Sequence, residues 1–132
     1  MSSVSFYVWG KVRGKGRPRF TRGGHAYTPK ATRDYEAAIR EAYMNAPERP
    51  PEPFSGPVSV SVATCRQLPK SAPKSVSSEP DTHKPDVDNI AKVVLDALNG
   101  VAWLDDAQVT SLTVVKLDRE RREECLRVRI TD

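Results

Sequence analysis

The chain of 132 residues is 38% hydrophobic and carries a formal net charge of +4, and its length suits one domain over 1–132, because a second hydrophobic core would be hard to build. No run of 18 or more apolar residues is present, which excludes a membrane-spanning helix, and the first residues lack the pattern of a signal peptide. Cys65 and Cys125 are far apart and outside any metal-binding spacing, so we expect reduced core residues in a cytoplasmic protein.

The first third of the chain predicts a strand, a basic loop and a helix. Val4, Phe6 and Val8 alternate with other residue types, as in a half-buried strand. Residues 10–33, the basic arm, are rich in Gly, Arg and Lys and predict a loop with a short hairpin around Gly23-Gly24. A Thr-Pro start and apolar residues at helical spacing then predict a helix over 29–45.

The middle of the chain predicts a strand between two proline-rich segments. Residues 46–57 hold five prolines and form a connector, and alternating valines predict a half-buried strand over 58–65. Residues 66–85 hold four prolines and show no hydrophobic period, so we expect a long, mobile loop. Such a loop in a small domain is usually functional or disordered.

The last third predicts a helix and two strands. Apolar residues at helical spacing predict a helix that begins near Asp88 and ends before Asn99-Gly100. Strands are predicted near 109–117 and at 126–130, with a charged turn at 118–124 between them. The expected fold is therefore α/β (α+β), a small mixed β-sheet with two amphipathic helices, and the strand order is not predicted.

Charge is distributed unevenly along the chain. Residues 1–33 carry eight basic side chains and no acid, whereas residues 34–132 carry 13 basic and 17 acidic ones. A basic arm suits a polyanion, because Lys and Arg displace counterions from phosphates. The acidic body suits a metal-dependent enzyme that acts on nucleic acid better than a protein that only binds it.

The stretch HKPDVDN, residues 83–89, places two carboxylates directly before the second predicted helix. An extended entry could aim Asp86 and Asp88 at neighbouring positions, and Lys92 lies one helical turn after Asp88. If Asp106 folds back across the start of this helix, three carboxylates converge, and carboxylate oxygens are the ligands that Mg²⁺ prefers. Lys92 could then neutralise charge on a phosphate.

The same acids also fit an ordinary structural interpretation. Asp86 or Asp88 could cap the helix, Lys92 could be a solvated surface residue, and Asp105-Asp106 could form a turn. The turn after the helix is too short to return along the helix unaided. Asp106 can reach the helix start only if the next segment folds back across it or the helix is shorter than predicted. The spacing alone leaves both interpretations open.

The basic arm has a binding interpretation and a structural one as well. Lys15, Arg17 and Arg19 alternate, so in an extended chain they project to one side, which suits a phosphate backbone. Phe20 and Tyr27 are interleaved among the arginines. The alternative is a solvated charged segment without a ligand.

Taken together, these residues resemble the RusA family of Holliday junction resolvases. KPDVDNIAKVVLDAL, residues 84–98, resembles the acidic core of the family, and WLDDAQV, residues 103–109, resembles its second signature. KGRPRFTRGGHAYTPKATRDYE, residues 15–36, looks like the basic N-terminal stretch of the phage-type branch.

The resemblance implies an endodeoxyribonuclease that resolves four-way DNA junctions in recombination and repair, in the cytoplasm and nucleoid of a bacterial or phage-infected cell. It implies a homodimer that makes paired symmetric nicks with Mg²⁺, for which Mn²⁺ could substitute, without a membrane or a small-molecule cofactor. By motif position, Asp86, Asp88 and Asp106 correspond to the essential metal-binding acids, with Asp105 beside the third, and Lys92 corresponds to an important lysine. The implied DNA contacts are Lys15, Arg17, Arg19, Arg22 and Lys84.

Two other functions fit the sequence. One is a nuclease that acts on forks or flaps, and the other is a non-catalytic nucleic-acid-binding module in which the acids only cap and solvate. The sequence does not separate these substrate shapes, because selectivity for shape depends on the geometry of the dimer.

Overall fold

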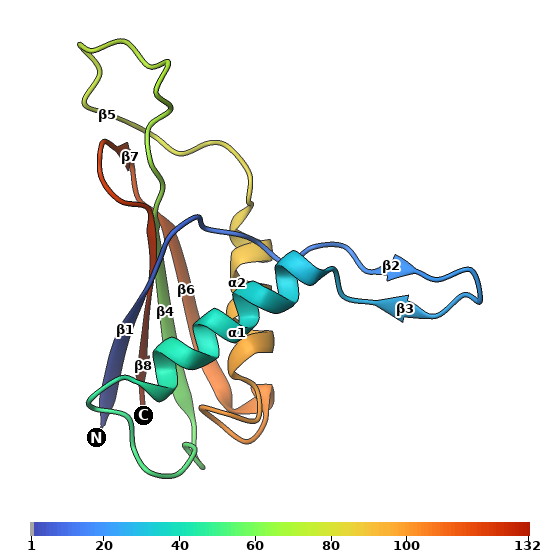
Figure 1. Cartoon of the computed structure of the whole chain (residues 1–132). Helices are drawn as coiled ribbons and strands as arrows, with labels where there is room; N and C mark the ends of the chain where they lie inside the picture. The colour runs from blue at the N-terminus through green and yellow to red at the C-terminus, as the bar shows by residue number, and fades with distance from the viewer. Residues whose placement is uncertain (1) are drawn as a thin grey trace.

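A mixed sheet of four strands, in the order β1-β8-β4-β6, organises the molecule (Figure 1). The structure is a computed structural model that describes residues 2–132. Strand β8 is antiparallel to both of its neighbours, β1 and β4, whereas β4 and β6 are parallel. These strands span β1 (Ser3–Trp9), β4 (Val58–Cys65), β6 (Val109–Lys116) and β8 (Cys125–Thr131). The structure thus confirms a mixed sheet with two helices.

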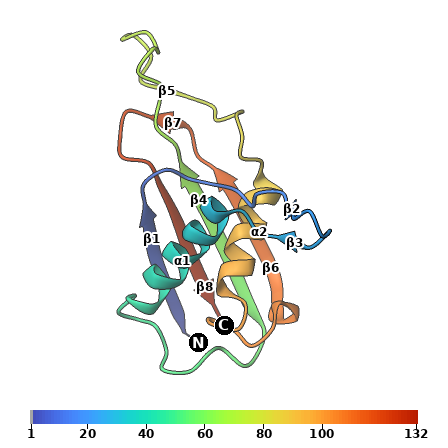
Figure 2. The same cartoon turned by 45° about the vertical axis from the view of Figure 1, so that its right-hand side comes forward.

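Both helices, α1 (Lys30–Met44) and α2 (Val87–Leu98), lie across one face of the sheet (Figure 2). Their apolar sides pack against the strand residues that point to this face of the sheet. This packing explains why apolar residues recur at helical spacing in the helices and at every second position in the strands. Ile39, Ile90 and Leu98 are completely buried there. Each contributes about 1.5–3 kcal/mol to folding by its removal from water.

Strand β4, helix α2 and strand β6 form a β-α-β unit. Parallel strands need a crossover connection, so α2 returns along the sheet in the direction opposite to β4 and β6. The start of α2 therefore lies at the carboxyl ends of these strands. The Lys116 ammonium, at the end of β6, donates a hydrogen bond to the His83 carbonyl just ahead of α2, in agreement with this arrangement.

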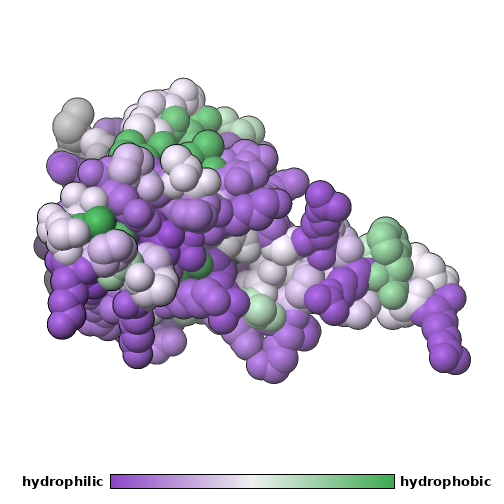
Figure 3. Space-filling view, turned by 90° about the horizontal axis from the view of Figure 1, so that it is seen from above, coloured by the Kyte–Doolittle hydropathy of each residue, from purple (hydrophilic) through white to green (hydrophobic). Residues whose placement is uncertain are grey.

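The basic arm contains the predicted hairpin. Strands β2 (Arg19–Phe20) and β3 (Ala26–Tyr27) pair antiparallel, and the turn between them includes Gly24 with φ +82°, a conformation that favours glycine. Figure 1 shows the hairpin standing away from the sheet and helices. Seen from above, its surface mixes hydrophilic side chains with pale and hydrophobic ones (Figure 3).

Two short strands lie in segments where the sequence predicts only a loop and a turn. Strand β5 (Ser78–Glu79) pairs antiparallel with β7 (Arg119–Glu120). The Arg121 guanidinium also donates to the carbonyls of Pro73 and Val76, at 2.9 and 3.0 Å. Strands of two residues have no period to detect, so the description of these segments as loop and turn alone is wrong.

The cysteines and the two helices bear on two further features of the chain. Cys65 and Cys125 face one another across β4 and β8 as buried free thiols. Within residues 2–132, neither helix combines the length and the apolar character that a membrane crossing requires.

Candidate functional site

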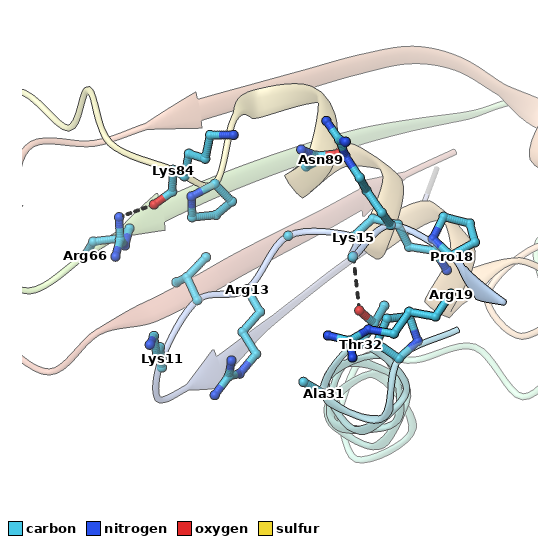
Figure 4. A pocket seen from close by; sticks show the side chains of 16 residues that line it. Lys11, Arg13, Lys15, Pro18, Arg19, Ala31, Thr32, Arg66, Lys84 and Asn89 are labelled. Atoms are coloured by element: carbon cyan, nitrogen blue, oxygen red, sulfur yellow. Dashed lines mark hydrogen bonds between the residues drawn. The ribbon is translucent and has the colours of Figure 1, made fainter. Parts of the chain in front are cut away.

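A basic cleft of about 590 Å³ lies between the arm and the start of α2 (Figure 4). Its walls come from the arm, from the start of α1, from the two ends of segment 66–85 (Arg66, Lys84 and Pro85), and from Asn89 in α2. No acid is among the described residues that line it, so it is suited to bind phosphate groups. Its basic lining residues are Lys11, Arg13, Lys15, Arg17, Arg19, Arg66 and Lys84.

The base of the arm is attached to both helices. The Lys15 amide donates to the Asn89 carbonyl on α2 at 3.0 Å, and the Gly16 amide donates to Thr32 Oγ1 on α1 at 3.0 Å. Gly14 packs so closely that a Cβ there would lie 2.8 Å from the Pro85 Cβ. These contacts fix the position of the cleft relative to the acidic stretch.

Lys15 is part of this attachment. Its ammonium lies 2.8 Å from Glu36 Oε2 on α1 and 3.0 Å from Asp96 Oδ2 on α2, and its side chain is 19% exposed. Partial burial by itself lowers the pKa of Lys15, but hydrogen bonds and charge attraction from the two carboxylates raise it overall. Lys15 is thus a charged link between the helices, unlike the exposed Arg17 and Arg19.

Gly14→Ala is expected to lower the free energy of unfolding by about 1–3 kcal/mol, because the added methyl group meets two Cβ atoms in a packed junction. The base of the arm must then move away from α2. Urea unfolding measures the loss, and Gly56→Ala is a matched control, since nothing lies within 4 Å of a Cβ at that position. Equal stability of the two variants would show that the arm is loosely held.

Asp86, Asp88 and Lys92 lie at the start of α2, beside the cleft. Asp86 occupies the N-cap position with φ −74° and ψ 159°, yet its carboxylate accepts no hydrogen bond from the first turn. Asp88, in the first turn, and Lys92, one turn later, are both exposed. Asp86 therefore stands at the cap position that the structural interpretation gives it, but without a side-chain cap hydrogen bond.

A buried carboxylate supports the segment that leads to Asp86. The Asp81 side chain is fully buried, with Arg66 at 3.8 Å and Lys116 at 4.0 Å. The same two cations donate hydrogen bonds to the carbonyls of Lys84 and His83. Arg66 therefore both lines the cleft and holds the approach to the acidic pair.

Asp106 lies at the other end of α2. It begins the short 3-10 helix η1 (Asp106–Gln108), which directly precedes β6. Trp103 Nε1 donates to Asp106 Oδ1 at 2.9 Å, and this fixes one carboxylate oxygen. The length of α2, about 18 Å at 1.5 Å per residue, separates Asp106 from the Asp86 end.

Gln108 holds this second acidic turn in place. Its Oε1 accepts from the amides of Leu104 and Asp105 at 2.8 and 2.9 Å, and its Nε2 donates to the carbonyls of Phe54 and Gly56 at 2.7 and 2.9 Å. The sequence analysis assigned no role to Trp103, Gln108 or Arg66. Trp103 and Gln108 stand within two residues of the acids Asp105-Asp106, and this proximity could have raised the expectation, whereas Arg66 carries no local signal.

The predicted metal site does not form within one chain. Across residues 2–132, no three His, Cys, Asp or Glu side chains are placed to hold a metal ion together. The fold-back of Asp106 to the helix start, which convergence requires, does not occur. Asp86 and Asp88 are neighbours at the carboxyl ends of the parallel strands β4 and β6. Asp105 and Asp106 form a separate acidic turn at the amino ends of these strands.

The charge of the basic cleft, beside a carboxylate pair, is suited to a nucleic acid. Residues 10–131 match the family described as Endodeoxyribonuclease RusA, and the chain belongs to that family. It is therefore an endodeoxyribonuclease, a hydrolase that cuts DNA within the strand. The chain is also similar to the uncharacterized protein YqaN of Bacillus subtilis (strain 168), with 35% identity over 131 residues, which cover 91% of each chain.

Proposed function

We propose that this chain resolves four-way DNA junctions as a Mg²⁺-dependent homodimer that makes paired symmetric nicks. The observation that carries the proposal is the basic cleft whose wall ends at Pro85 and Asn89, on either side of the carboxylate pair. A DNA strand held by the arm would thus have a phosphate close to two unpaired acids. Family membership supplies the reaction class, and the cleft supplies a place for the substrate.

In this proposal the acids bind the metal and the basic residues bind the DNA. Asp86, Asp88 and Asp106 are the proposed Mg²⁺ ligands, with Asp105 as a further candidate, and Mn²⁺ would substitute for Mg²⁺. Lys92, exposed one turn after Asp88, would neutralise charge on the scissile phosphate. The proposed DNA contacts are Lys15, Arg17, Arg19, Arg22 and Lys84, and the ion pairs of Lys15 with both helices also hold the arm in position.

The products of junction resolution are the reason for proposing a homodimer. Sealable products require nicks in two strands, and one acidic pair cannot reach both strands of a junction at once. The proposed setting is recombination and repair in the cytoplasm and nucleoid of a bacterial or phage-infected cell.

The test is incubation of the purified chain with a synthetic four-way junction, a fork and a linear duplex, with Mg²⁺ or with EDTA. Symmetric nicks confined to the junction and dependent on the metal are expected. Equal cutting of forks would move the proposal to a fork or flap nuclease. Tight junction binding without nicks in Mg²⁺ or Mn²⁺ would overturn it in favour of a non-catalytic binding module.

Trp103→Phe is expected to slow junction cleavage about tenfold at unchanged junction affinity. The phenyl ring keeps most of the buried contact, but Asp106 loses its indole donor, a hydrogen bond worth about 1–1.5 kcal/mol, and with it a fixed orientation. Single-turnover cleavage measures the effect. Trp9→Phe, at an indole that is 56% exposed, is the matched control, and parental rates in both variants would remove Trp103 from the positioning of Asp106.

A further inference from the structure

In the described part of the chain, one face of the four-stranded sheet carries no helix. Helices α1 and α2 lie on the other face, where Val4, Phe6 and Val8 of β1 belong to the core that the helices cover (Figure 2). Because successive strand residues point to opposite faces, the residues between these buried ones point away from the helices. We call this second face, formed by the outward residues of β1, β4, β6 and β8, the open face.

Two exposed aromatic side chains stack on one another on the open face. Tyr7 and Trp9 are successive outward residues of β1, with ring centroids 5.3 Å apart and ring planes at 15°. Tyr7 is 47% exposed and Trp9 is 56% exposed. A stacked pair that is held in solvent leaves its outer ring surfaces free for a further planar group.

Two arginines on β8 lie beside the aromatic pair. Arg127 is directly opposite Tyr7, and Arg129 is directly opposite Ser5. Both arginines are exposed, and within the described chain neither of them is in an ion pair. The Arg129 guanidinium donates a hydrogen bond to Ser3 Oγ at 3.1 Å, which leaves its charge in place. The positive charge of both side chains is therefore available to an anionic ligand.

The rest of the open face is made of short side chains. On β4 and β6 the outward positions hold only serine, threonine, alanine, valine and cysteine. Across β4, Arg127 is opposite Ala63 and Arg129 is opposite Ser61. Short side chains there leave space for a ligand above the sheet. Among the outward residues of the described strands there is no acid that would repel a phosphate.

Aromatic rings beside arginines are a combination that binds single-stranded nucleic acid. Unpaired bases stack on aromatic side chains, whereas the bases of a double helix are already stacked on their neighbours. Arginines pair with the phosphates between the bases. We propose that the open face binds single-stranded DNA, with a base stacked on the Tyr7–Trp9 pair and phosphates held by Arg127 and Arg129.

This surface is separate from the basic cleft. The cleft is lined by the arm and by the starts of α1 and α2, on the side of the sheet that the helices cover. None of the described residues that line the cleft is an outward residue of the sheet. The proposal therefore goes beyond the proposed function and does not depend on it. The cleft would hold the branched duplex, and the open face would hold an unpaired strand.

Tryptophan fluorescence tests the proposal directly. Trp9 is exposed and Trp103 is completely buried, so a base that stacks on the protein surface reaches only Trp9. Titration of the parent chain with oligothymidylate is expected to quench the emission to saturation. A linear duplex at the same nucleotide concentration is expected to quench it far less. Absence of quenching by oligothymidylate, or equal quenching by the duplex, would overturn the proposal.

Two variants separate the stacking contribution from the charge contribution. Tyr7→Thr removes half of the aromatic pair and is expected to weaken oligothymidylate binding about tenfold. Arg127→Gln with Arg129→Gln removes two phosphate contacts. It is expected to lower the slope of log affinity against log salt by about 1.4. The anisotropy of a labelled oligonucleotide measures both quantities, and parental affinity in both variants would overturn the proposal.

Matched controls come from exposed residues outside the sheet. Met44→Thr alters an α1 residue that is 49% exposed, and Lys70→Gln with Lys74→Gln removes two charges from segment 66–85. Both should bind oligothymidylate as the parent chain does. Trp9→Phe keeps a ring in the stack, so it should lose the fluorescence signal and retain the affinity. Equal loss of affinity in the lysine and arginine variants would reduce the binding to general charge attraction and overturn the site.

Junction assays separate failure of this proposal from failure of the proposed function. The open-face variants should cleave a four-way junction at the parental rate. Replacement of Arg17 and Arg19 by alanine should preserve the quenching of Trp9 by oligothymidylate, and loss of this quenching would move the single strand to the cleft and overturn the proposal. A chain that binds oligothymidylate on the open face but leaves junctions uncut would refute junction resolution and retain the single-strand site.

Discussion

Asp88→Asn is expected to bind a four-way junction as tightly as the parent chain and to cleave it at least about 100-fold more slowly. The amide has the size of the carboxylate and stays exposed in the first turn of α2, so the fold and the basic cleft are retained. The variant loses the negative charge that would hold Mg²⁺. A bound metal ion stabilises the transition state by several kcal/mol, and loss of this stabilisation lowers the rate by a factor of this order. Gel-shift titration in Ca²⁺ and single-turnover cleavage in Mg²⁺ measure the two quantities.

Asp34→Asn is the control for this substitution. Asp34 is also an exposed acid near the start of a helix, but its carboxylate pairs with Lys30 at 2.7 Å on the outer side of α1. It should bind and cleave as the parent does. Parental cleavage by Asp88→Asn would show that the acidic pair has no role in the reaction.

Replacement of Arg17 and Arg19 by alanine is expected to weaken junction binding at low salt by about tenfold or more. Both side chains are exposed and line the cleft, and neither forms an ion pair within residues 2–132, so their charge is available to phosphate. Loss of two phosphate contacts also reduces the slope of log affinity against log salt by about two. Binding titrations at several salt concentrations give the slope.

Lys70→Ala with Lys74→Ala removes the same charge from segment 66–85, away from the cleft lining. This pair controls for a general effect of net charge on DNA affinity. If both double variants lose affinity equally, the cleft has no special role. An unchanged salt slope in the arginine variant would place the arm outside the DNA interface.

The regular elements were accessible from the sequence because each carries its own period. The predicted strand at 58–65 coincides with β4, and the predicted helix at 29–45 differs from α1 by one residue at each end. The hairpin around Gly23-Gly24 was marked by turn residues. Strand order was not accessible, because pairing of β8 between β1 and β4 depends on contacts between distant segments.

The acidic site shows where local reasoning ends. The motif placed Asp86 and Asp88 correctly at the start of a helix, since both lie within three residues of one element. The position of Asp106 depends on the parallel pairing of β4 with β6, which no residue near Asp106 reveals. Likewise, the spacing of Lys15 did not reveal its ion pairs with Glu36 and Asp96, which are far from it and from each other in the sequence.

The arm has a base that is held by Gly14 and Lys15 and an exposed tip at residues 17–27. This division affects how related nucleases can diverge. Insertions or deletions in the turn at Gly23-Gly24 would change how far along the DNA the tip reaches, while the anchored base keeps the cleft in its place. Substrate range could therefore change by a change in arm length alone. The catalytic end of the molecule would not have to be rebuilt.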